Sequence, residues 1–317
     1  MKIAETKIKY LLLLIFCIFL EIGTNSSQEL PMYSNYTFNR LAINPAYVGL
    51  NSDPEVNISY RNQWTNLDGA PVFGHVSYDQ PVKYTRNSFG AMAYFDKLGI
   101  EKNIGLRGYY SFKAEFSENS FIQFGFSAGL RNYSHDYTLL HLYHNEDPAA
   151  QQPLNLVVPT AGVGLYYVYG NLNIGFSLPQ LLKTTIDGAE HSTKYARFAE
   201  NYFYGIVGYN LDNLLGKLYV HPSIVAKYVQ GAPLYLDYII NFGFNERIGL
   251  GLSYRTNEAI VGMIDVKIGE RMLLGYAYDF PLSDIGFYSV GSSEIILKLR
   301  LAKKESQTEG LLTMVRN

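Results

Sequence analysis

The stretch that decides the fold is Ser120–Arg131, which reads SFIQFGFSAGLR. Its even positions from Ile122 to Leu130 are apolar, and its odd positions from Gln123 to Arg131 carry Gln, Gly, Ser, Gly and Arg. Successive side chains of a strand point to opposite faces, so one face of this segment is apolar and the other is polar. A tilted strand needs roughly 9–11 residues to cross a bilayer, whereas strands in soluble proteins usually have about 5–6. The stretch therefore predicts a membrane-spanning strand, provided that the pattern recurs.

The same alternation does recur along the chain and gives about 14 runs. In chain order they are 56–61, 75–79, 89–95, 104–113, 120–131, 161–169, 174–178, 196–210, 218–228, 234–244, 248–254, 260–268, 274–280 and 295–299. The run at 196–210 is the least regular, because Tyr202–Tyr204 interrupt its period. An even number of strands is what a single-chain bacterial barrel requires, with both of its ends on the periplasmic side.

The connections between the runs segregate by length. The odd ones include the longer segments 62–71, 96–102, 132–157, 179–194 and 281–292, and the even ones include the short turns 170–171, 245 and 269–270. Longer even connections at 80–87, 113–119 and 210–216, and short odd ones near 70–72, 230–233 and 256–258, are exceptions that do not reverse the rule. Outer-membrane barrels alternate long outer loops with short periplasmic turns. We therefore predict an all-β, transmembrane, antiparallel up-and-down β-barrel of about 14 strands, with loops 132–157, 179–194 and 281–292 outside. A secreted all-β sandwich is the alternative.

The composition agrees with long amphipathic strands. The chain has 317 residues, 28 Tyr, 28 Gly and 17% charged residues, against about 25% in soluble domains. Its formal net charge is −2, so it lacks the basic excess of a nucleic-acid-binding protein, and we expect no nucleic-acid partner.

The N-terminus has the layout of a secretory signal peptide. Lys2, Lys7 and Lys9 precede the apolar stretch 10–20, which is too short to span a bilayer as a helix. Cys17 leaves a lipoprotein alternative open, although bulky Phe16 precedes it. We expect a signal peptide at 1–27, a periplasmic or lumenal plug-like segment at 28–54, the barrel at 55–301 and a polar tail at 302–317.

The polar faces of the runs carry both signs of charge. They hold Arg61, Arg107, Arg131, Lys227, Lys267 and Lys298, together with Asp79, Asp237, Asp265 and Asp279. A pore selective for one sign of charge would favour that sign among its lining residues. A mixed lumen suits internal ion pairs or a plugging segment as well as a channel.

No motif argues strongly for catalysis or metal binding. Ser77, His75 and Asp79 share one face of a strand, which leaves a barrel-borne hydrolase as an alternative, but no Gly-x-Ser-x-Gly elbow is present. The glycines of 105–108 lie mid-strand, where Gly more often marks a bulge or close packing than a phosphate loop. We predict no enzyme activity and no cofactor.

The longest loop collects potential metal ligands. They are His135, Asp136, His141, His144, Glu146 and Asp147. Their spacing matches no recognised zinc pattern, so we predict no metal site.

Two aromatic and polar clusters are not explained by strand alternation. The first comprises Pro31, Tyr33, Tyr36, Phe38, Asn39, Asn44, Pro45, Ala46, Tyr47 and Gly49. The second comprises Arg61, Gln63, Trp64, Asp68, Gly69, Ala70 and Pro71. Asn-Pro, Asp-Gly and Pro specify tight turns. Trp64, the only tryptophan, suits either an interfacial belt or a specific packing role.

At these clusters the chain resembles the PorP/SprF family of outer-membrane proteins of the Bacteroidetes type IX secretion and gliding motility machinery. Segments 275–279 and 291–294 near the end of the chain resemble the family too. The resemblance implies a non-enzymatic barrel in the outer membrane of a Gram-negative bacterium. The implied partners are other type IX components or an exported surface adhesin, besides membrane lipid, and the two clusters would serve structure or partner binding. The polar tail departs from barrels that end on their last strand.

A passive porin or small-solute channel is the alternative function, since it shares every barrel feature.

Overall fold

The protein is described from a computed structural model. The residues described are 33, 34, 36, 38–135, 154–182, 184–187, 194–198, 202–214, 218–229, 232–245 and 247–301. The predicted signal peptide, Pro31, the polar tail and every candidate metal ligand except His135 lie outside them. Among the described residues no helix is long and apolar enough to cross a membrane.

Nearly every described segment is a β-strand. The strands are β1 (Glu55–Asn62), β2 (Val72–Pro81), β3 (Asn87–Leu98), β4 (Glu101–Ser117), β5 (Ser120–His135), β6 (Leu154–Tyr169), β7 (Leu172–Leu178), β8 (Thr184–Asp187), β9 (Lys194–Phe198), β10 (Tyr202–Tyr209), β11 (Leu211–Leu214), β12 (Leu218–Val229), β13 (Tyr235–Phe244), β14 (Ile248–Arg255), β15 (Ala259–Ile268), β16 (Met272–Pro281) and β17 (Ser292–Arg300). The helical pieces are α2 (Arg40–Ile43), η1 (Pro45–Tyr47) and η4 (Asp284–Phe287).

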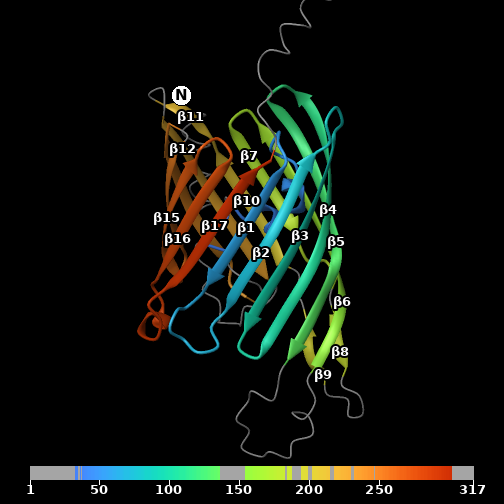
Figure 1. The fold of residues 1–317 in the computed structure, drawn as a ribbon, viewed down its shortest axis with the longest axis vertical. Coiled ribbons are helices and arrows are strands. Elements are labelled where there is room, and N and C mark those ends of the chain that lie inside the picture. The colour runs from blue at the N-terminus through green and yellow to red at the C-terminus, as the bar shows by residue number, and fades with distance from the viewer. Residues whose placement is uncertain are drawn as a thin grey trace, which may run out of the picture.

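The strands form one closed antiparallel barrel (Figure 1). Apart from β8 and β9, which pair with each other in a separate sheet, and β11, which pairs with β12, strands that follow one another in sequence are neighbours in the sheet. β7 pairs with β10, β10 pairs with β12, and β1 pairs with β17. Because β10 and β11 both pair with β12 and share one position in the wall, the described barrel has 14 strands. The predicted fold class is confirmed.

The two ends of the barrel differ. The barrel segment starts and finishes at the end that carries the short turns, which we call the turn end and which lies uppermost in Figure 1. The opposite end, the loop end, carries the connections β1–β2 and β16–β17.

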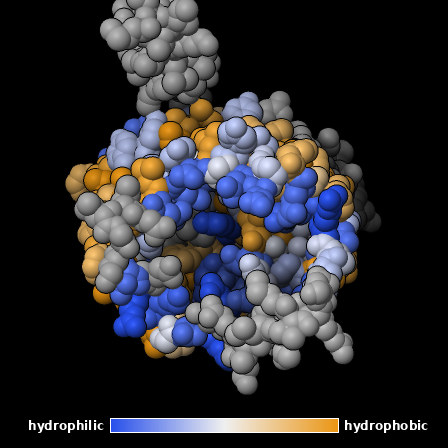
Figure 2. Space-filling view, turned by 90° about the horizontal axis from the view of Figure 1, so that it is seen from above, coloured by the Kyte–Doolittle hydropathy of each residue, from blue (hydrophilic) through white to orange (hydrophobic). Residues whose placement is uncertain are grey.

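The wall of the barrel has the polarity that Ser120–Arg131 predicts. In β5, Phe126 and Leu130 are more than half exposed on the outside, whereas Gln123 and Ser127 are buried inside. Figure 2, which looks onto the turn end, shows hydrophobic residues around the circumference and hydrophilic residues around a central recess.

The structure corrects three predicted boundaries. The connection predicted at 96–102 is a two-residue turn, because β3 ends at Leu98 and β4 begins at Glu101. The run at 196–210 divides, because 194–198 pairs with β8 as a separate hairpin and only β10 and β11 join the barrel. The predicted loop 132–157 is shorter, because β5 extends to His135 and β6 begins at Leu154. Alternation underestimated these strands because Tyr133 points inward, where polar side chains were expected.

Candidate functional site

The interior of the barrel is occupied by residues 33, 34, 36 and 38–50, which we call the plug. This segment contains α2 and η1, and its Tyr36, Ile43, Ala46 and Val48 are buried. It is therefore the feature around which the inward-facing side chains are arranged.

The first anchor of the plug is a buried polar cluster at Glu294 of β17. The Ser34 N–H donates to Glu294 Oε2 at 2.6 Å, and the Asn39 amide donates to Glu294 Oε1. Arg61 of β1 donates to the Ser34 hydroxyl and forms an ion pair with Asp279 of β16 at 2.7 Å. Buried charges are tolerated when they are paired and hydrogen-bonded, so this cluster requires the plug to be in place.

The second anchor is Arg255 at the end of β14. It is 1% exposed and lies 3.4 Å from Asp237 and 3.3 Å from Asp279. Its Nη2 donates to the Tyr33 carbonyl at 2.8 Å. The predicted run at 248–254 stops one residue short of Arg255, so sequence reasoning missed it, although its inward position follows from that of Ser253.

The third anchor is the turn that Asn44 begins. The Asn44 Oδ1 accepts from the Ala46 N–H at 2.8 Å, and its amide donates to the Leu165 carbonyl of β6 at 3.2 Å. A Cβ at Gly125 of β5 would overlap the Ala46 backbone, and a Cβ at Gly164 would overlap the Asn44 side chain. The two glycines therefore let the plug lie directly on the strands.

The fourth anchor is where the plug leaves the lumen. The Val48 carbonyl accepts from Ser111 Oγ at 3.0 Å and from Gln123 Nε2 at 2.7 Å. Gly49 has a φ of +68°, a conformation that favours glycine, and its N–H donates to Asp79 Oδ2 at 2.8 Å.

An apolar core joins the plug to part of the wall. Tyr33, Tyr36 and Ile43 share one buried cluster with inward Val261 and Met263. Burial raises the pKa of the Tyr33 and Tyr36 phenols above the ordinary value, which keeps them neutral. These inward apolar residues would face water in an empty lumen, so their presence agrees with a filled one.

The second sequence cluster divides between two places. Arg61 lies in the lumen, whereas Gln63–Pro71 form the β1–β2 connection at the loop end. There Gln63 N–H donates to the Pro71 carbonyl at 2.9 Å, and Trp64 N–H donates to Ser292 Oγ at 3.1 Å. Gly69 has a φ of +76°, and its carbonyl accepts from the Gly99 N–H at 2.8 Å, which ties the β1–β2 and β3–β4 connections.

The alternative hydrolase residues line β2 beside the plug. His75 packs against the rings of Tyr33 and Phe73, and Asp79 accepts the Gly49 N–H. His75 and Asp79 each contact the plug, through Tyr33 and Gly49. His135, the described member of the metal candidates, lies 3.0 Å from Glu101 Oε1, and no metal-ligand cluster occurs within the described ranges.

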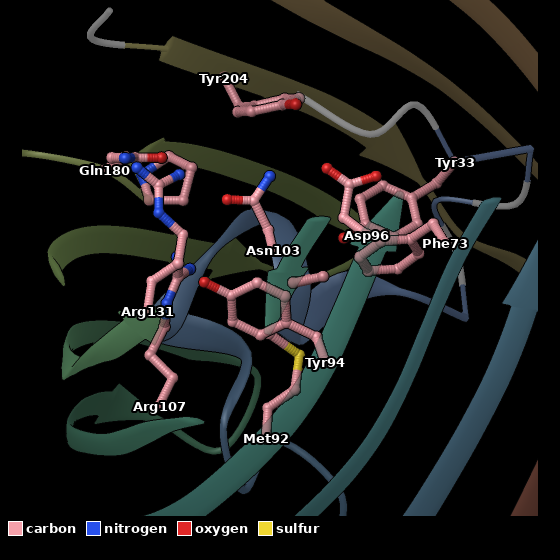
Figure 3. A pocket seen from close by; sticks show the side chains of 12 residues that line it. Tyr33, Phe73, Met92, Tyr94, Asp96, Asn103, Arg107, Arg131, Gln180 and Tyr204 are labelled. Atoms are coloured by element: carbon pink, nitrogen blue, oxygen red, sulfur yellow. The ribbon is translucent and has the colours of Figure 1, made fainter. Parts of the chain in front are cut away.

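Cavities lie on both sides of the plug. One, of about 320 Å³, opens at the turn end and is lined by residues that include Arg40, Asp265, Lys267 and Lys298. Another, of about 60 Å³, lies on the loop-end side of the plug and is lined by residues that include Tyr33, Arg107 and Arg131 (Figure 3).

A sequence model of the family described as "Type IX secretion system membrane protein PorP/SprF" matches residues 25–299. The chain belongs to the PorP/SprF family. This PorP/SprF protein is an outer-membrane β-barrel of a type IX secretion system family. No curated protein sequence matches it.

Several solved structures are similar to this PorP/SprF barrel at low sequence identity. The toluene transporter TodX of P. putida is 10% identical with a TM-score of 0.49, over 84% of this chain and 95% of that one. The outer membrane protein Omp33 of Acinetobacter baumannii is 8% identical with a TM-score of 0.47, over 80% and 100%. The translocator domain of the autotransporter NalP from Neisseria meningitidis is 11% identical with a TM-score of 0.40, over 79% and 89%.

Proposed function

We propose that this PorP/SprF protein is a non-enzymatic, plugged barrel that acts as an accessory or anchor in type IX secretion, or in the export and attachment of surface adhesins. The observation that carries the proposal is the plug, which is bonded to opposite parts of the wall.

The plug contacts strands around much of the barrel. Besides its anchors on β1, β14, β17 and β5, the Ile43 carbonyl accepts from Ser177 Oγ of β7 at 2.6 Å. Releasing the segment would break hydrogen bonds on several walls and leave the Arg61 and Glu294 charges without their plug contacts. Such a lumen favours a fixed platform over a passive water-filled pore.

The loop end supplies a surface for a partner. In outer-membrane barrels the termini and short turns face the periplasm, so the loop end faces outward. Here the β1–β2 and β16–β17 connections are tied together, since Thr65 N–H donates to the Gly291 carbonyl at 2.8 Å. Beside this contact the Phe287 and Tyr288 side chains are 85% and 71% exposed.

Exposed large aromatic residues mark interaction sites more often than isolated small apolar ones do. We assign this loop-end surface, made by 62–71 and 282–291, to an exported surface protein. Residues of the second sequence cluster would hold the surface in shape rather than catalyse anything.

Affinity purification of the tagged full-length protein from outer membranes tests the proposal. The variant Phe287→Ser/Tyr288→Ser should lose its secreted partner, whereas Tyr84→Ser/Phe116→Ser should retain it. The control pair is comparable because Tyr84 and Phe116 are aromatic residues near the turn end whose side chains are at least 69% exposed. A native complex without any secretion or adhesin component would overturn the anchoring role.

The cavities on the two sides of the plug favour one second candidate, a small-solute channel. Planar-bilayer recording separates the two functions. A plugged anchor should give a closed or rarely open barrel, whereas a large and steady conductance would favour the channel.

A further inference from the structure

The cavity on the loop-end side of the plug is positively charged. Arg107 of β4 and Arg131 of β5 line it, with Asp96 as the one carboxylate among its lining residues. In Figure 3 both arginines gather with Gln180 on one side, Asp96 lies with Tyr33 and Phe73 on the other, and Asn103 lies between. The arginine side of the cavity therefore lacks a carboxylate of its own.

Arg107, which is buried, and Arg131, which is half-buried, differ from the buried arginines Arg61 and Arg255. Arg61 and Arg255 each form ion pairs with carboxylates. Arg107 is 8% exposed, and its charged contact is with the face of the Tyr94 ring, 5.4 Å away. Within the described part of the chain, neither Arg107 nor Arg131 has a carboxylate within ion-pairing distance, and the Nε of each is buried without a hydrogen-bond acceptor.

The register of β4 and β5 brings the two arginines together. Arg107 pairs with Gly129 across the β4–β5 ladder, and Arg131 pairs with Gly105, so the two arginines are diagonal neighbours on one face. A Cβ at Gly105 would overlap the Tyr94 ring. That ring packs on the glycine and makes a cation–π contact with Arg107. The glycines at 105 and 129 thus leave both guanidiniums room over the cavity.

A buried guanidinium without a counter-charge is costly, and an anion would remove that cost. A planar guanidinium matches the two oxygens of a carboxylate. We propose that this cavity binds a carboxylate group, presented from the loop end, between Arg107 and Arg131, with the Gln180 amide as a further donor.

The size of the cavity limits what enters it. A water molecule needs a cavity of about 10–15 Å³, so a cavity of 60 Å³ admits a group of a few heavy atoms. A free small carboxylate fits, and so does the carboxylate at the end of a peptide or side chain whose remainder stays above the plug. The inference does not depend on the anchoring role, because a channel would carry the same site.

Ligand-observed saturation-transfer NMR on the full-length protein in micelles tests it. The ligands are acetate, the peptide acetyl-Gly-Gly-Ala with a free carboxyl terminus, the same peptide amidated, and inorganic phosphate. Both carboxylates should bind and compete with each other, and the amidated peptide should not. The peptide binding more tightly than acetate would identify a chain terminus as the source, and equal binding would identify the free small anion.

The variants Arg131→Gln and Arg107→Lys should each weaken carboxylate binding about tenfold or more, because a charge-assisted bidentate contact is lost. Arg247→Gln, an exposed arginine at the turn end, should leave binding unchanged. Heat-modifiable migration on gels shows that each variant is folded. Binding that survives in folded Arg131→Gln, or phosphate that outcompetes both carboxylates, would overturn the proposal.

Discussion

The backbone of Ala46 lies against Gly125 of β5, in the space that any side chain at position 125 would need. One strand glycine therefore decides whether the plug can seat on this wall. Mid-strand glycines weaken a sheet, so a glycine here is explained by the approach of another backbone rather than by the strand itself.

Replacing Gly125 with Val should displace the plug without destroying the barrel. Overpacking costs about 1–3 kcal/mol, which a closed barrel with intact strand pairing can absorb. We expect the variant to insert normally and to show new, larger conductance steps in planar bilayers.

The matched control is Gly108→Val on the neighbouring strand. Gly108 faces outward, and the nearest atom to its Cβ position is 3.8 Å away, so the control should remain closed. A closed Gly125→Val barrel would contradict the contact between plug and strand as the seal.

Removing the Arg61 side chain should destabilise the protein strongly. Arg61→Ala leaves Asp279 with only Arg255 and leaves Glu294 without its nearest cation, and breaking a buried pair costs about 3–5 kcal/mol. Urea unfolding in micelles, followed by tyrosine fluorescence, measures the loss.

Arg300→Ala is the comparison for that experiment. Its ion pair with Asp53 spans 3.8 Å between side chains that are both more than one-third exposed. Exposed pairs contribute about 0–1 kcal/mol. Equal losses in the two variants would mean that the Arg61 cluster does not hold the plug.

The wall could be predicted from the sequence because apolar and polar side chains alternate with a period of two residues along its strands. Ile122 to Leu130 alternate with polar residues, and the same rule gave all 14 positions around the barrel. The hairpin of β8 and β9 could not be predicted, because 184–187 reads as part of a loop and 196–198 reads as the start of the next run.

The lumen was less predictable. Asn44–Tyr47 read as turn residues, and they do form a turn. Their packing on Gly125 and Gly164 could not be predicted, because it depends on contacts between residues more than 70 positions apart in sequence. Inward Val261 and Met263 break the polar pattern because they face the plug rather than water. The family residues, Glu294 among them, could be named from motifs, whereas their partner Arg255 emerges only when the barrel is closed.

An arginine placed on the outer surface should destabilise the barrel by an amount that depends on its depth in the bilayer. Leu252 lies midway along β14 and is 56% exposed, whereas Leu301 follows β17 at the turn end and is 51% exposed. Leu252→Arg should cost about 2–4 kcal/mol and Leu301→Arg about 0–1, since the penalty is largest at the bilayer midplane. Unfolding from phosphocholine vesicles measures both, and similar costs at both sites would argue against a lipid-facing position for Leu252.

Neutralising Glu294 should loosen one part of the plug only. Glu294 is fully buried and accepts from the Ser34 N–H, the Asn39 amide and the Ser59 hydroxyl, so Glu294→Gln keeps the size but loses charge-assisted bonds worth about 1.5–3 kcal/mol. Hydrogen exchange measured by mass spectrometry should rise in peptides covering 33–40. It should stay low in those covering 45–50, which are held by Ser111 and Gln123 instead.

The control for that measurement is Glu270→Gln, an exposed turn-end residue whose replacement should change nothing measurable. Uniform exchange along the whole plug in Glu294→Gln would show that the segment leaves the lumen as one unit. Its anchors would then act cooperatively rather than independently, and any partner that released one of them would open the barrel.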